Sequence, residues 1–281
     1  MKSGGYYLKP VMTGNLLLDG GAMFGVVPKV LWSKTNPADA NNRIEMAMRS
    51  LYIRAGNRKI IIDSGAGTKL NEKMIRNYGI ESEDLSLVLR RQGIEPESIT
   101  DVISTHLHFD HAGGLTYFDS SGEIQLTFPG AVHYFQEKQW EAGINPNEKD
   151  RASFFTENFV PVKSKGKLSL LNGEAEISDG IKVIPTEGHT PGHQVVLIET
   201  GEENLLYCGD LIPLASHVNL PYIMAYDHFP LSTLEEKKKF LGRAADENWI
   251  LFFEHDPEIS ACRVRRNEKG RFEISEQVEL E

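Results

Sequence analysis

Three histidines and an aspartate fall within six consecutive positions of the chain, in the segment HLHFDH that runs from His106 to His111. The apolar residues before this segment predict a buried strand over residues 99–104, so the polar side chains follow at its end. In an extended chain His106 and His108 point to the same side. Asp110 and His111 come after a turn and can therefore bind at a second metal centre. We therefore expect this segment to bind metal.

Three later strands are predicted to end at further candidate ligands. The strand over residues 181–185 leads into the loop of His189, the strand over 204–208 precedes Asp210, and the strand over 249–253 precedes His255. A rigid scaffold collects polar groups at one rim in this way. A catalytic ion takes about three protein ligands and a solvent position, so these candidate ligands and those of the first segment are together too many for one ion. We predict two divalent ions, zinc first with iron, manganese, cobalt or nickel as alternatives, held by His106, His108, Asp110, His111, His189, Asp210 and His255.

Two other histidines, His133 and His193, are expected to have roles other than direct metal binding. His133 lies in a predicted strand over residues 131–134 and is expected to be a structural histidine with satisfied polar atoms. His193 either orients a metal ligand from a second layer or holds the turn over residues 190–192. Of these two interpretations, we favour the turn.

The order of apolar patterns predicts an α/β fold. Helices are expected over residues 70–78 and 84–92, each ending near a glycine, and over residues 136–142, 150–158 and 233–247. Strands over residues 46–55, 60–63 and 194–199 and a closing hairpin over 260–275 join those named above. The simplest layered solution is an αββα sandwich, with two mixed sheets in the middle and helices on the outer faces, formed as one domain by residues 1–281.

Charge and composition exclude several classes of protein. A formal net charge of −10 argues against a general nucleic-acid surface, because phosphate backbones are held by clusters of Lys and Arg. No apolar run approaches the roughly 20 residues that span a bilayer, and no leader opens the chain, so no membrane partner is expected. The two cysteines, Cys208 and Cys262, fit a reduced cytoplasmic protein better than a disulfide scaffold. The oligomeric state is left open and includes a homodimer.

The motifs HLHFDH, GHTPGH, CGD and FEHD together resemble the metallo-β-lactamase-fold hydrolase superfamily. The resemblance implies that His106, His108 and His189 hold one metal, that Asp110, His111 and His255 hold the other, and that Asp210 lies between them. It also implies that Asp63, which follows an early predicted strand, orients a ligand histidine. The alternative interpretation is that Asp63 only forms a turn at the end of that strand.

Among the branches of this superfamily, the chain most resembles the quorum-quenching N-acyl-homoserine lactonases. The β-lactamases carry cysteine or serine at the position of Asp210, and the diiron flavoproteins carry glutamate at that of His108. The tRNA-processing nucleases add a basic arm, and glyoxalase II proteins usually append a helical domain, neither of which this sequence indicates. The segment Leu16–Trp32 is similar to the early hairpin that overhangs the lactonase site. Within it, Met23 and Phe24 either offer apolar surface to a ligand tail or pack into the core.

One position departs from the lactonase pattern. Those lactonases have a tyrosine three residues after the bridging aspartate, and this chain has Pro213. A hydroxyl or imidazole donor could instead come from the segment LPYIMAYDHF, which contains Tyr222, Tyr226 and His228.

The sequence therefore predicts a dinuclear hydrolase that acts on a small ester-like molecule. A metal-bridging hydroxide is expected to open a lactone or carboxylic ester bond, with Asp110 orienting the hydroxide or passing a proton to the leaving oxygen. The first alternative is a phosphodiester or phosphotriester hydrolase, since two cations also stabilise a phosphoryl transition state. A binding module without activity is a second alternative, and the complete set of seven ligands argues against it.

Overall fold

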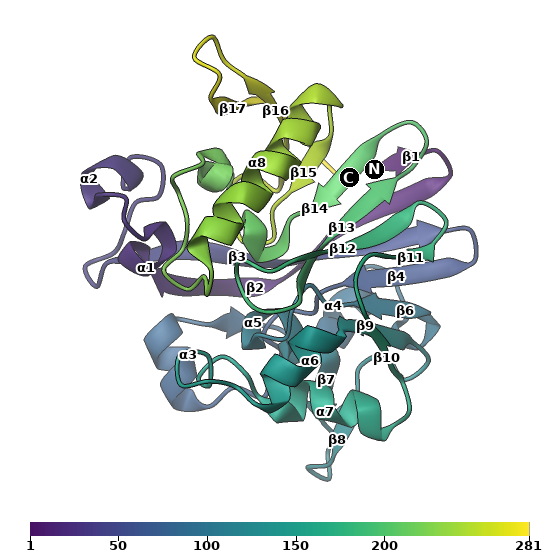
Figure 1. Ribbon diagram of the computed structural model, residues 1–281. Coiled ribbons are helices and arrows are strands. Elements are labelled where there is room, and N and C mark those ends of the chain that lie inside the picture. The colour runs from purple at the N-terminus through teal and green to yellow at the C-terminus, as the bar shows by residue number, and fades with distance from the viewer. Residues whose placement is uncertain (281) are drawn as a thin grey trace.

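The first of two large β-sheets is built from strands within residues 2–171, in a computed structural model that describes residues 1–280 (Figure 1). Its main path follows the order β1-β2-β3-β4-β6-β9-β10, and β5 pairs with β2. The sheet is mixed, because β1 to β4 pair antiparallel whereas β4, β6, β9 and β10 pair parallel. Its strands are β1 Lys2–Ser3, β2 Tyr6–Asp19, β3 Arg43–Ala55, β4 Arg58–Ile62, β5 Glu81–Ser82, β6 Asp101–Ile103, β9 Val132–Gln136 and β10 Leu168–Leu171.

The second sheet is built from the C-terminal half and follows the order β11-β12-β13-β14-β15-β16-β17. It is also mixed, since β14 and β15 pair parallel and the other neighbours pair antiparallel. The strands are β11 Ala175–Ser178, β12 Ile181–Thr186, β13 His193–Glu199, β14 Asn204–Tyr207, β15 Ile250–Phe252, β16 Ala261–Arg266 and β17 Phe272–Gln277. A separate small hairpin joins β7 Thr116–Phe118 to β8 Ile124–Leu126.

Helices cover the outer faces of both sheets, which confirms the predicted αββα sandwich (Figure 1). The long helix α8 lies over the second sheet, and α4, α6 and α7 lie on the side of the first sheet. Among residues 1–280, no helix combines the length and hydrophobicity that crossing a bilayer requires. The helices are α1 Gly20–Phe24, α2 Lys29–Trp32, α3 Glu72–Tyr78, α4 Leu85–Arg91, α5 Phe109–Ala112, α6 Glu137–Ile144, α7 Thr156–Ser164 and α8 Pro230–Asp246.

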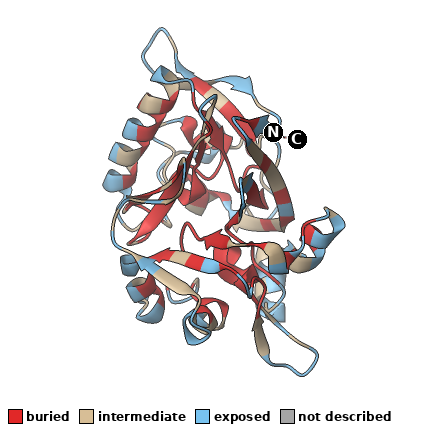
Figure 2. Ribbon diagram, turned by 90° about the vertical axis from the view of Figure 1, so that its right-hand side faces the viewer, coloured by how far each residue is buried: buried red, intermediate tan, exposed pale blue. Residues whose placement is uncertain are grey.

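The two sheets pack against each other through the alternation of side chains along their strands. In β4, Ile60 and Ile62 face the second sheet, whereas Ile61 between them joins the core under the helices. Leu51 of β3 and Phe252 of β15 belong to the same core between the sheets, and both are fully buried. Figure 2 shows the resulting pattern, with buried residues along the sheets and exposed residues on the outer faces of the helices.

The strands that were expected to end at candidate ligands share one direction within each sheet. In the first sheet β4 and β6 run parallel, so the residues after Ile62 and Ile103 lie at the same edge. In the second sheet β14 and β15 run parallel, and β12 shares their direction because β12 and β14 each pair antiparallel with β13. Polar side chains that follow all five strands therefore meet at one rim of the sandwich.

Two local predictions were wrong. Residues 148–153 form turns instead of the first part of a helix, because Asp150 uses its carboxylate to bind His228, and helix α7 begins only at Thr156. The segment Leu16–Trp32 is not a hairpin, because strand β2 ends at Asp19, whose side chain caps α1 by accepting a hydrogen bond from the Ala22 amide. Gly20 then packs so closely on Trp32 that a Cβ atom would lie 2.4 Å from the indole.

We predict that Leu51→Ala destabilises the protein by about 2–5 kcal/mol, because it leaves a cavity between the two sheets. The matched control is Leu87→Ala on α4, where 55% of the leucine is exposed and the expected loss is about 0.5 kcal/mol or less. Urea unfolding followed by circular dichroism measures both changes. Equal losses in the two variants would contradict this description of the core.

Candidate metal centre

The first group of candidate ligands consists of His106, His108 and His189, and it joins the two sheets. His106 and His108 follow β6 of the first sheet, and His189 follows β12 of the second. His106 Nε2 lies 3.0 Å from His108 Nδ1, and His189 Nε2 lies 3.2 Å from the same atom. All three side chains are at least nine-tenths buried. The structure thus brings together the three histidines that the resemblance assigns to one metal.

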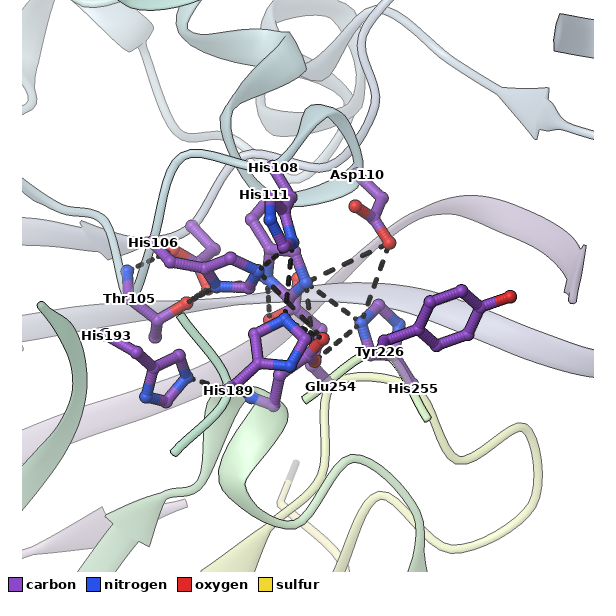
Figure 3. A network of polar contacts seen from close by, with 12 residues as sticks. Thr105, His106, His108, Asp110, His111, His189, His193, Tyr226, Glu254 and His255 are labelled. Carbon is purple, nitrogen blue, oxygen red and sulfur yellow. Dashed lines mark hydrogen bonds and ion pairs between the residues drawn. The ribbon is translucent and has the colours of Figure 1, made fainter. Parts of the chain in front are cut away.

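The second group consists of Asp110, His111 and His255. Asp110 and His111 lie on the short helix α5, and His255 follows β15 of the second sheet. His111 Nε2 lies 3.1 Å from His255 Nε2, and Asp110 Oδ2 lies 3.9 Å from the first of these atoms and 4.0 Å from the second. These are the three residues that the resemblance assigns to the other metal, and Figure 3 shows their side chains converging.

Asp210 follows β14 and places its carboxylate between the two groups. Its Oδ2 atom lies 3.2 Å from His189 Nε2 and 3.9 Å from His106 Nε2. Its Oδ1 atom lies 3.4 Å from His111 Nε2 and 3.2 Å from His255 Nε2. One carboxylate oxygen therefore faces each group, which is the arrangement that a bridging ligand requires.

The chemistry of these groups fits divalent cations. Lone pairs of neutral imidazoles repel when they face each other, so nitrogen atoms 3.0–3.2 Å apart need a proton or a cation to share. Within each group, one nitrogen or oxygen atom per residue lies within 4.8 Å of the others. Nitrogen and carboxylate ligands in this mixture are those that zinc and its neighbours bind.

Protonation states differ across the centre. Burial, helped by the nearby histidines, holds the pKa values of His106 and His108 well below the usual range, so both stay neutral. Burial alone would also lower the pKa of His255, but the charge of Asp210 raises it to about 9. Burial would raise the pKa of Asp210, yet the surrounding histidines hold it well below its usual range. The centre therefore contains an ionised carboxylate whose nearest partners carry protons that a metal would displace.

Asp63 lies behind the second group, where it contacts His111. Its Oδ2 atom lies 3.1 Å from His111 Nδ1, and its two oxygens accept hydrogen bonds from the amide and hydroxyl of Thr105. The backbone at Asp63 is left-handed, with φ of 53°, a conformation that aspartate tolerates better than most residues. Both interpretations of Asp63 thus have a counterpart in the structure, because it turns the chain and also holds a histidine ring.

Sequence reasoning missed two carboxylates that support the candidate ligands. Glu254 Oε2 lies 3.0 Å from His111 Nδ1 and accepts a hydrogen bond from Tyr207 Oη, and burial raises the Glu254 pKa to about 8. Asp227 Oδ1 lies 2.9 Å from His189 Nδ1. Such partners fix the orientation of a ligand ring. Glu254 precedes His255 and could have been found from that position, whereas nothing in the local sequence singles out Asp227.

The two other histidines have clear positions. His193 closes the predicted turn through its amide, which donates to the carbonyl of Thr190, and its Nε2 accepts a hydrogen bond from the Asp210 amide. It therefore serves the turn and also holds the backbone of Asp210. His133 is fully buried in β9, and burial lowers its pKa to about 4, so the ring is neutral. The backbone of Phe128 is a polar neighbour of this ring and partly offsets the effect of burial on its pKa.

A pocket of about 310 Å³ opens onto the candidate ligands. His108, Asp110, His189, Asp210 and His255 line its polar end. The remaining walls are mostly apolar, with Lys149, Asp150 and Ser153 as the other polar residues, and they include Leu18, Met23, Met46, Tyr78, Phe109, Met224, Ala225 and Tyr226. Pockets of this size and composition hold small organic molecules.

The five residues predicted to contact substrate occupy different places. Met23 and Tyr226 line the pocket, and the hydroxyl of Tyr226 points away from the histidines (Figure 3). Phe24 is fully buried and stacks on Trp32 with ring centroids 5.0 Å apart, and Tyr222 packs edge-on against Phe24. His228 binds Asp150 at 2.5 Å. Phe24, Tyr222 and His228 therefore lie behind the residues that line the pocket.

Known proteins that are similar to this chain include lactonases and a metal-dependent hydrolase. A family model described as the metallo-β-lactamase superfamily matches residues 49–255. An N-acyl homoserine lactonase of a Bacillus species is 30% identical over 224 residues, which cover 73% of this chain and 80% of the relative. A probable metal-dependent hydrolase from Staphylococcus aureus has 33% identity and a TM-score of 0.90, covering 99% of this chain and 98% of the other. A dizinc quorum-quenching lactonase has 22% identity and a TM-score of 0.82, covering 100% and 97%.

We predict that zinc binding to the metal-free protein at neutral pH releases protons. His255 carries a proton below pH about 9 because its pKa is raised, and only a neutral imidazole binds a metal. Zinc titration calorimetry in two buffers of different ionisation enthalpy counts the protons released. The number should fall as pH rises through about 9 and should be smaller in His255→Ala. Proton release that is the same in His255→Ala as in the wild type would contradict the assignment.

Proposed function

We propose that this chain, which belongs to the metallo-β-lactamase superfamily and is a metallohydrolase, uses two divalent metal ions to open the ester bond of a small lactone or carboxylic ester. The observation that carries the proposal is the position of Asp210, whose two carboxylate oxygens face two separate groups of buried ligands. The apolar pocket above these groups supports a small organic substrate. The similarity to N-acyl homoserine lactonases supports an ester bond as the bond that breaks.

The chain itself supplies binding and orientation. Divalent cations in such a site polarise a carbonyl and lower the pKa of water, which is the chemistry that ester hydrolysis needs. His106, His108 and His189 would hold one ion, Asp110, His111 and His255 the other, and Asp210 both. Asp63, Glu254 and Asp227 keep the rings of His111 and His189 in place through their second nitrogens.

Asp110 is the proposed proton carrier of the reaction. Asp110 and His111 both lie on α5, but of these two Asp110 lines the pocket, and it is only 8% exposed. When the ester bond breaks, the leaving alkoxide oxygen must gain a proton. A carboxyl group next to that oxygen can deliver the proton taken from the attacking water.

Pro213 supports a substrate other than the long-chain homoserine lactones. Proline offers neither a hydroxyl nor an N–H group, and the Pro213 carbonyl accepts the amide of His255 at 3.3 Å. Tyr226 lines the pocket but turns its hydroxyl away from the cluster (Figure 3). A missing oxyanion donor typically costs about 10² to 10³ in rate. We therefore propose that acyl-homoserine lactones are poor substrates and that another lactone or ester is preferred.

We predict that the zinc-loaded protein hydrolyses simple lactones and aryl carboxylic esters faster than a long-chain acyl-homoserine lactone, and an aryl phosphodiester slowest. Asp110→Asn should lower kcat on the best ester by about 10²–10⁴, because the proton carrier is lost. Tyr226→Phe should leave kcat unchanged, because the hydroxyl does not face the reacting atoms. Initial rates on the four substrates measure all three effects.

The control for these rates is Asp246→Asn, which changes an exposed carboxylate at the end of α8 and should behave as the wild type. Faster turnover of the phosphodiester would favour the phosphoryl-ester alternative. A fast acyl-homoserine lactonase that is undiminished in Tyr226→Phe would show that Pro213 is no functional departure.

A further inference from the structure

The pocket depends on residues 219–228, a segment with no helix or strand. Met224, Ala225 and Tyr226 of this segment line the pocket, and the next residue, Asp227, holds His189. A segment without regular structure needs other contacts to keep its side chains in place. Contacts with other elements therefore fix the side of the pocket that these residues form.

Two ends of this segment are held in different ways. At its C-terminal end, the His228 amide donates to the His189 carbonyl at 3.0 Å, and the Phe229 amide donates to the Gly188 carbonyl at 2.9 Å. At its N-terminal end, Nζ of Lys237 lies 2.6 Å from the Tyr222 carbonyl, 3.0 Å from that of Asn219 and 3.4 Å from that of Leu220. The terminal amino group of Lys237 thus donates to three carbonyls within residues 219–222, just before the residues that line the pocket.

Lys237 is an unusual residue for its position. It lies on α8 and is 1% exposed, and lysines are almost never fully buried without a partner. The hydrogen-bond partners of its Nζ atom are the three carbonyls, and the charge of Asp227 also favours the protonated form. Burial lowers the Lys237 pKa to about 7. An aliphatic side chain would fill the same space without this cost, so packing alone does not account for the lysine.

We propose that Lys237 is a positioning residue that fixes the substrate-facing side of the pocket by holding residues 219–222 through its terminal amino group. It touches neither the candidate ligands nor the pocket, and it acts through Met224 and Tyr226. This inference rests on the proposed function, because it assigns the pocket to substrate. Loss of the three hydrogen bonds lets the segment move, and substrate binding must then order it again, which raises KM.

The neighbouring residue provides a matched comparison. Glu236 accepts hydrogen bonds from the amides of Glu187 at 2.7 Å and Gly188 at 3.2 Å, and therefore holds the loop that carries His189. Adjacent residues of α8 thus hold two different parts of the site, Lys237 the pocket side and Glu236 a ligand loop. Changing one should loosen its own segment and leave the other in place.

The test is hydrogen exchange of backbone amides in Lys237→Met, Glu236→Ala and the surface control Lys238→Met. In Lys237→Met the amides of Tyr222 and Ala225 should exchange about tenfold faster or more, while those of Gly188 and His228 keep the wild-type rate. In Glu236→Ala the Glu187 and Gly188 amides should become faster instead. Lys238→Met should match the wild type, since Lys238 pairs with Glu235 on the surface.

Kinetics provide the second readout. In Lys237→Met, KM for the best ester should rise about tenfold with zinc content unchanged, and kcat should fall less than KM rises. Lys237→Gln keeps two N–H donors and should fall between Lys237→Met and the wild type in both measurements, which also covers poor folding of the methionine variant. Exchange that quickens evenly over the whole chain, or not at all, would overturn the proposal. Because exchange needs no substrate, this outcome is separate from a failure to hydrolyse esters.

Discussion

The candidate metal centre depends on the carboxylate of Asp210, which lies between two groups of buried ligands. Burying five histidines and two aspartates costs free energy unless each polar atom has a partner. The two oxygens of Asp210, each 3.2 Å from a histidine nitrogen, are the shared partner of both groups. Because one group joins β6 to β12 and the other joins α5 to β15, the same contacts tie the two sheets together at this rim.

The rest of the structure serves to hold these side chains. Parallel strands deliver the candidate ligands to one edge, and carboxylates outside them orient the rings. The backbone is held in the same way, since His193 accepts the amide of Asp210 and Glu236 accepts the amides before His189. Helix α8 extends this support to the pocket through Lys237. Most of the site is therefore rigid, and its least regular part is the segment that lines the pocket.

The sequence was sufficient to predict the candidate ligands and the layered fold, because both depend on local signals. Apolar runs such as Val102-Ile103 end at polar residues, and this pattern places the ligands at strand ends without any knowledge of the third dimension. Asp227 and Lys237 could not be predicted, because their roles depend on contacts between segments far apart in the chain. The same is true of Asp150, whose contact with His228 replaces the helix that the local pattern favours. The role of Phe24 could not be predicted either, because the sequence does not distinguish an apolar residue that faces a ligand from one that packs in the core.

In the proposed centre, two metal ions lie on either side of Asp210. Anomalous diffraction at the zinc edge, from crystals of the protein grown with zinc, tests it most directly. We expect two peaks of similar height, each within bonding distance of one Asp210 oxygen. One should lie next to His106, His108 and His189 and the other next to Asp110, His111 and His255. A single peak, or two peaks of which only one touches Asp210, would contradict it.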